Sequence, residues 1–205
     1  DTKDGIGKFS PPGDVRIVEK DVLVAGFRGQ TLVVPSACDA PEGPWKAAIL
    51  PEDFRIDAGN CPVTDAVPLE EVAMRAVASP AATTLVTVDL GDLNWDPRLG
   101  VVAGLVPRQL EEEIPRWKFV EKKRRDRSAW LLTSHDTLEF SGVSLAARRS
   151  FFSRALELAL SGSADKKDYG GDEDGWVELH ELATFVAAQT DAWARADNGD
   201  AHAQH

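Results

Sequence analysis

Cysteine is rare in this sequence, and long apolar runs are absent. Only Cys38 and Cys61 occur among 205 residues. Two cysteines are too few for a small secreted scaffold held together by disulfides, so we expect free thiols in a cytoplasmic protein, with one bridge as the alternative. No stretch approaches the roughly 18 consecutive apolar residues of a membrane-spanning helix. The polar first residues also lack the apolar segment of a secretory leader, so the sequence predicts neither secretion nor a membrane partner.

Positive charge is also in short supply. The 23 lysines and arginines are outnumbered by 34 aspartates and glutamates, which gives a net charge of −11. Because proteins that bind nucleic acid rely on clustered lysine and arginine, the composition predicts no nucleic-acid partner. The basic run at residues 118–127 could contact an acidic partner or a membrane surface, but such a run is more often a solvated loop.

Methionine occurs once, at Met74, and the chain begins at Asp1, so we expect a piece of a longer product. Hydrophobic residues make up 43% of the chain, which suffices for one substantial core. Residues 1–20 are rich in glycine and proline and are expected to form a flexible or irregular segment. Residues 21–205 are predicted to form a single α/β domain.

Apolar, β-branched runs alternate with helical patterns along the chain. The runs predict strands at residues 21–25, 30–34, 47–50, 84–88 and 130–133. The helical patterns predict helices at residues 68–79 and 151–160 and from Leu179 onward, with a helix or turn at 100–113. The run Thr84 to Val88 is typical of a strand buried on both faces of a mainly parallel sheet. Trp130 and Trp193 are expected on core faces.

The strand predicted at 84–88 leads into Asp89 and Asp92. Ligands and catalytic groups of open parallel sheets lie at the carboxyl ends of the strands. We therefore expect function first at these two aspartates. Asp89 could equally be a residue that only caps the loop after its strand.

Motifs for a nucleophile are weak in this sequence. Ser134, His135 and Asp136 are the residue types of a hydrolase triad, but neighbours in an extended segment point to alternate sides and cannot form the required relay. Neither Cys38 nor Cys61 has a base nearby in sequence that would activate its thiol. Neither cysteine lies in a Cys/His spacing typical of zinc.

The acidic segment at residues 170–181 is similar to a calcium-binding loop of the helix-loop-helix type. The carboxylates at its third, fifth, ninth and twelfth places are Asp172, Asp174, Glu178 and Glu181. Its sixth place is a glycine, as such loops require, but Gly170 occupies the first place, where a ligating aspartate belongs. Two interpretations stay open: a calcium site, or an acidic turn that leads into a short strand and a capped helix.

The order of these segments resembles the caspase-like (caspase/metacaspase) peptidase fold, and more closely a bacterial branch found in large multidomain proteins. Residues 21–29, DVLVAGFRG, look like the family's strand that ends in a His-Gly pair. Residues 85–92, LVTVDLGD, look like the strand that presents the nucleophilic cysteine. Further matching segments are WKAAILPEDF at 45–54, WLLTSHD at 130–136, SFFSRALELALSG at 150–162, DEDGWVELHELATFV at 172–186 and the closing Gln204-His205. The match runs in order from about residue 21 to residue 205.

This resemblance implies a three-layer caspase-like (caspase-hemoglobinase) fold over residues 21–205, with a mainly parallel sheet flanked by helices. The family's first strand and helix are missing, because residues 1–20 are too short to supply both. Either they lie outside this chain, or another chain completes the sheet edge. In this family the turn that matches residues 172–186 usually needs no metal.

At the family's catalytic positions the residue types differ. Arg28 stands where the histidine belongs, and Gly91 stands where the cysteine belongs. Arginine stays protonated and cannot act as a general base, while glycine carries no nucleophile. The resemblance also implies that Asp89, with Asp92 nearby, can help to hold a basic side chain.

These departures predict a catalytically inactive domain that serves as an interaction or regulatory module of a larger bacterial protein. Its expected partner is a protein or peptide bound through a basic side chain, or another domain of the same polypeptide. Two alternatives are an active hydrolase with a displaced nucleophile, such as Cys38 or Ser134, and a calcium-responsive module built on the acidic segment.

Overall fold

The computed structural model describes residues 22–35, 44–51, 66–91, 105–116, 128–134, 142–144 and 149–198. The basic run and both cysteines lie outside these ranges, as do residues 1–20, Asp92, His135 and Asp136. The strands are β1 (Val22–Pro35), β2 (Trp45–Ile49), β3 (Val67–Pro68), β4 (Thr83–Gly91), β5 (Ser128–Thr133), β6 (Val143–Ser144) and β7 (Arg149–Ser150). The α-helices are α1 (Leu69–Val77), α2 (Leu105–Glu113), α3 (Phe151–Leu158) and α4 (Leu179–Asn198).

Five of the strands form one mixed sheet in the order β3-β2-β1-β4-β5. β1, β4 and β5 are parallel neighbours, whereas β2 and β3 are joined to the sheet by antiparallel pairing. β6 and β7 form a separate two-stranded sheet. The predicted α/β class, with a central parallel portion, is therefore confirmed.

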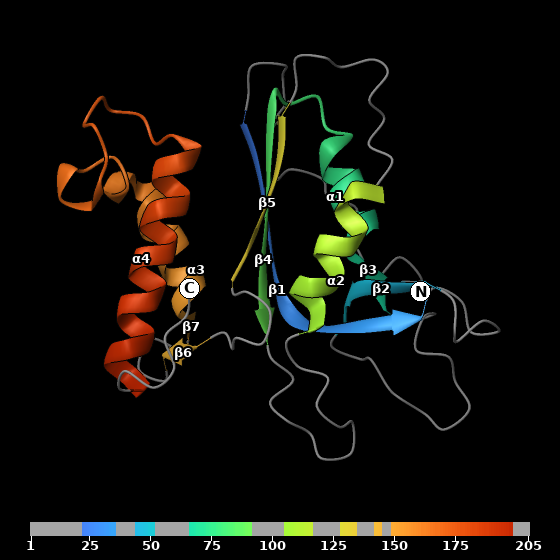
Figure 1. Ribbon diagram of the computed structural model, residues 1–205. Helices are drawn as coiled ribbons and strands as arrows, with labels where there is room; N and C mark the ends of the chain where they lie inside the picture. The colour runs from blue at the N-terminus through green and yellow to red at the C-terminus, as the bar shows by residue number, and fades with distance from the viewer. Residues whose placement is uncertain are drawn as a thin grey trace.

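β1 is one continuous strand of 14 residues, so the prediction of two separate strands at 21–25 and 30–34 is wrong. Its residues Val22 to Gln30 pair with β4 without a break, and the strand then pairs with β2 and curves past α2 (Figure 1). Gly26 and Gly29 lie between the two predicted runs, but neither ends the strand. Gly26 instead serves close packing, because a Cβ there would lie 3.2 Å from Oγ1 of Thr87 on β4.

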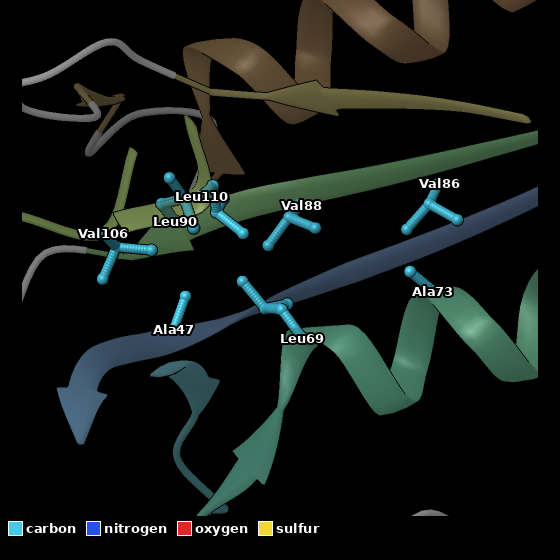
Figure 2. Packing of buried hydrophobic residues seen from close by; sticks show 8 residues of the cluster. All are labelled: Ala47, Leu69, Ala73, Val86, Val88, Leu90, Val106 and Leu110. Atoms are coloured by element: carbon cyan, nitrogen blue, oxygen red, sulfur yellow. The ribbon is translucent and has the colours of Figure 1, made fainter. Parts of the chain in front are cut away.

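Helices cover both faces of the sheet, with α1 and α2 on one side and α3 and α4 on the other (Figure 1). Under α1 and α2, a buried apolar cluster joins these helices to β2 and β4 (Figure 2). Its members are Ala47, Leu69, Ala73, Val86, Val88, Leu90, Val106 and Leu110. Because burial of apolar area is the main favourable contribution to folding, this cluster fixes the first helical layer on the sheet.

The second helical layer is held by another buried cluster, in which Leu85 of β4 packs with residues of α3, α4 and the turn between them. The helix-side members are Phe152, Ala155, Ala159, Ala164, Leu182, Phe185 and Val186. Phe152 and Ala155 on α3, and Leu182 and Val186 on α4, recur at the three- and four-residue spacing of an apolar helix face. Trp193 packs at the margin of this cluster, with its ring centroid 6.3 Å from that of Phe151.

β4 is buried on both faces, as predicted: Val86, Val88 and Leu90 pack in the first cluster, Leu85 packs in the second, and Thr84, Thr87 and Asp89 are buried as well. The prediction for Trp130 is wrong, since this residue of β5 is 51% exposed. Trp130 is in register with Leu85, which packs against the second helical layer, but it lies on the outermost strand of the sheet. Strand periodicity alone could not show how far that layer extends.

Helix ends follow local signals. Pro68 is the N-cap of α1, just before the first turn in which it was predicted, and Glu70 and Glu71 occupy that turn. α3 passes into a π-helical turn, Ala159–Ser163, in which Gly162 adopts a φ of 93°. A left-handed residue of this kind is usually glycine, so the predicted stop near Gly162 is confirmed. Across the described ranges, no helix combines the length and apolarity needed to cross a membrane.

Candidate functional site

Asp89 lies near the carboxyl end of β4 and is only 3% exposed. The hydroxyl groups of Ser150 and Ser153 both donate hydrogen bonds to Asp89 Oδ2. The distance from Ser153 Oγ to Asp89 Oδ2 is 2.5 Å. Ser150 is also the N-cap of α3, where its Oγ accepts a hydrogen bond from the N–H of Ser153 at 3.0 Å. The carboxylate thus lies at the amino end of α3, where the helix dipole favours negative charge.

Arg28 supplies the opposite charge. β1 and β4 place Arg28 in register with Asp89, and Arg28 Nε lies 3.7 Å from Asp89 Oδ2. The arginine side chain is about half exposed, whereas the aspartate is buried. A buried carboxylate is tolerated when a cation and hydrogen-bond donors compensate its lost hydration, and Asp89 has both.

Gly91 and Ser134 complete this end of the sheet. Gly91 is in register with Gln30, two residues beyond the Arg28–Asp89 pair. Ser134 is buried, its N–H donates to Val88 O at 3.1 Å, and its Oγ accepts from Leu90 N–H at 3.0 Å. The Ser134 hydroxyl therefore continues the ladder between β4 and β5.

We refer to Arg28, Asp89, Ser150 and Ser153 as the Asp89 cluster. The structure brings together the predicted residues Arg28 and Asp89, and it adds two serines that sequence reasoning did not assign to the site. A signal for them exists, because Ser150 precedes an apolar helical pattern as N-cap residues do. The triad hypothesis for Ser134 involves His135 and Asp136, which lie outside the described residues.

The second candidate site is the loop between α3 and α4, here called the acidic loop (residues 164–178). Carboxylate oxygens of Asp165, Asp172 and Asp174 lie within 4.8 Å of one another. Two of these aspartates were predicted as calcium ligands. Asp165 was missed because it precedes the segment that matches a calcium loop by five residues, and no spacing rule points to it.

Backbone N–H groups hold this loop together. The N–H of Asp174 donates to both Asp165 Oδ1 and Asp172 Oδ1 at 3.1 Å, and the N–H of Gly175 donates to Asp165 Oδ2 at 3.1 Å. Gly171 allows the close approach, because a Cβ there would lie 2.2 Å from the carbonyl carbon of Asp165. Hydrogen bonds from the loop's own backbone N–H groups therefore accompany the grouping of the three carboxylates.

The other two predicted calcium ligands lie elsewhere. Glu181 is 4% exposed, and its two carboxylate oxygens accept from the N–H groups of Asp172 at 3.1 Å and Glu178 at 3.0 Å. This is half of a capping box, which joins the acidic loop to the first turn of α4. Glu178 pairs with His180 Nδ1 at 3.1 Å. Among the described residues no strand follows the acidic loop; α4 begins directly at Leu179.

Comparison of the chain with protein-family models, curated proteins and solved structures gave no significant match.

Proposed function

We propose that this chain is a catalytically inactive caspase-like domain that works as a protein-interaction or regulatory module in a larger bacterial protein of the cytoplasm. The observation that supports it most is the pairing of Arg28, in the middle of β1, with Asp89, near the carboxyl end of β4. A cysteine peptidase of this type would carry an imidazole at the position of Arg28 and a thiol at the position of Gly91. Arg28 and Gly91 provide neither.

The proposed partner is a protein or peptide, including other domains of the same polypeptide. A basic side chain of that partner would compete with Arg28 and two serine hydroxyls, all of which contact Oδ2 of the buried Asp89 carboxylate. The cluster therefore supports a structural use of Asp89 and leaves Arg28, which is half exposed, as the group that a partner meets first.

Turnover assays test the loss of activity. The purified chain is incubated with fluorogenic peptides that carry Arg, Lys or Asp before the reporter, and we expect no turnover above that of buffer. Thiol- and serine-directed probes are applied in parallel. Turnover that disappears in Cys38→Ala or Cys61→Ala, or fold-dependent labelling of Ser134, would establish the displaced-nucleophile hydrolase and contradict this proposal.

A calcium-responsive module is the second candidate, and the convergence of Asp165, Asp172 and Asp174 favours it. Calcium takes carboxylate and carbonyl oxygens, commonly six to eight of them, so three carboxylates could supply part of a site. Calorimetric titration with CaCl2 tests this hypothesis. Binding heat that is lost in Asp165→Asn would support a calcium site, provided that it is kept in Asp168→Asn, the same change at a nearby exposed aspartate. Absence of binding heat, together with no rise in melting temperature on addition of calcium, would contradict it.

A further inference from the structure

Within the described ranges, the outer edge of β1 is an incompletely paired part of the sheet. Residues 22–30 pair with β4 along one edge, and no strand in the described ranges pairs with the other edge between Val22 and Gly29. Pairing with β2 begins at Thr31, and the N–H of Leu50 donates to Gln30 O at 2.9 Å. The next residue, Pro51, has no N–H with which to continue that ladder.

An open strand edge offers a row of backbone donors and acceptors to another extended chain. Side chains decide which chain fits. On the face shared with α3, this edge exposes Val22 and Val24, at 64% and 37%, and the half-exposed Arg28. Residues directly opposite one another on paired strands lie about 5 Å apart at Cβ, so each of these side chains would contact its cross-strand neighbour.

The positive charge of Arg28 favours an acidic residue at the opposite position of an added strand. Arg28 already faces Asp89 on β4, and a carboxylate on an added strand would place the guanidinium between two acidic groups. A second copy of this chain does not provide that carboxylate from the same edge, because the sequence VLVAGFRG of residues 22–29 contains no acidic residue. The edge therefore fits a different protein segment.

We propose that the Val22–Gly29 edge of β1 binds an extended segment of a protein partner as an added β-strand, with apolar side chains beside Val22 and Val24 and a carboxylate beside Arg28. This inference builds on the proposed function, since it supplies the surface of an interaction module. Main-chain hydrogen bonds provide the affinity, and the acidic residue fixes the register.

Synthetic peptides with the length of this edge test the proposal. Each alternates valine and threonine and carries one glutamate, which is moved along the series. We expect fluorescence anisotropy to show binding that depends on the position of the glutamate. Hydrogen exchange should slow at alternate amides within residues 22–29 when the best peptide is added, and an N-methylated version of that peptide should not bind.

Charge reversal provides the matched comparison. Arg28→Glu should weaken binding of the best peptide about five-fold, and replacement of its glutamate by lysine should restore the affinity. Arg75→Glu makes the same charge change on α1 and should leave affinity unchanged. Because Arg28→Glu also removes the contact with Asp89, Val24→Lys serves as a second variant; it should weaken binding while the Arg28–Asp89 pair stays in place.

The strand-addition proposal is overturned if no peptide of the series slows exchange in β1, or if Arg28→Glu and Arg75→Glu have equal effects on affinity. Analysis of the peptides by mass spectrometry separates this outcome from a failure of the proposed function. Cleaved peptides would contradict catalytic inactivity, whereas intact peptides that do not bind would contradict only the added strand.

Discussion

The negative charges of Asp89 and of the acidic-loop carboxylates are compensated in different ways. Asp89 is buried and is compensated by two serine hydroxyls, a guanidinium and the amino end of α3. Asp172 and Asp174 stay exposed to solvent, and backbone N–H groups orient the carboxylates of this loop. Water solvates Asp172 and Asp174, whereas the hydrogen-bond donors and the guanidinium around Asp89 compensate the hydration that its buried carboxylate has lost.

This difference predicts a structural role for Asp89 and a ligand-binding role for the exposed aspartates of the acidic loop. Substitution of Asp89 should damage the domain, because its carboxylate joins the sheet to α3. Substitution of the exposed aspartates should leave the fold nearly unchanged and alter only what the loop binds. The expected effects on stability therefore decrease from Asp89, through the buried Glu181, to the surface carboxylates.

The largest effect is expected for Asp89→Asn. The amide keeps the size of the side chain but removes the charge that accepts two hydroxyl bonds and attracts Arg28. We expect the free energy of unfolding to fall by about 3 kcal/mol in urea denaturation. Asp191→Asn is the matched control, because Asp191 pairs with Arg195 on the surface of α4 and should cost less than about 0.5 kcal/mol. Equal losses for the two variants would contradict the structural role of Asp89.

An intermediate effect is expected for Glu181→Gln. A carboxamide presents one oxygen and one NH2 group, so it cannot accept from both Asp172 N–H and Glu178 N–H. We expect a loss of about 1.5 kcal/mol and faster hydrogen exchange at these two amides. Glu178→Gln makes the same chemical change at an exposed position three residues away and should change stability little. Unchanged exchange in Glu181→Gln would show that the carboxylate does not hold the loop.

The smallest effect is expected at Glu157 of α3. A hydrogen bond from Arg154, with further attraction from Arg149, lowers the pKa of this carboxyl below its ordinary value of 4.5, although partial desolvation opposes the shift. A lowered folded-state pKa contributes stability that is present above the unfolded-state value and is lost as the pH falls through the folded-state pKa. Carboxyl titration by NMR should show the lowered pKa, and Arg154→Gln should raise it. A midpoint at 4.5 in both proteins would contradict these contacts.

The sequence predicted the helices and the central strand well because their signals are local. Val86 and Leu182 fall on apolar faces whose period matches their elements, and Gly162 stops its helix through its own backbone conformation. Trp130 was assigned wrongly because its exposure depends on how far the second helical layer extends. The continuity of β1 was missed because Gly26 serves packing against Thr87, a contact between strands that are far apart in sequence.

The candidate sites were predictable only in part, for the same reason. Arg28 and Asp89 stood out by position, but Ser150 and Ser153 reach Asp89 through the packing of α3 on the sheet. Asp172 and Asp174 fit a spacing pattern, whereas Asp165 joins them through a loop closure that Gly171 permits. Patterns along the chain report residue types at fixed spacing, and convergence from separate elements needs the fold.

The central claim is that the Asp89 carboxylate stabilises the fold by joining the sheet to α3. The most direct test is a double-mutant cycle, measured by unfolding, between Asp89→Asn and Ser150→Ala. Such a cycle removes the separate cost of losing the Ser150 helix cap and isolates the interaction between the two side chains. We predict a coupling free energy of about 1.5 kcal/mol, as expected for a hydrogen bond to a charged group. Additive effects, with a coupling below about 0.3 kcal/mol, would contradict the claim.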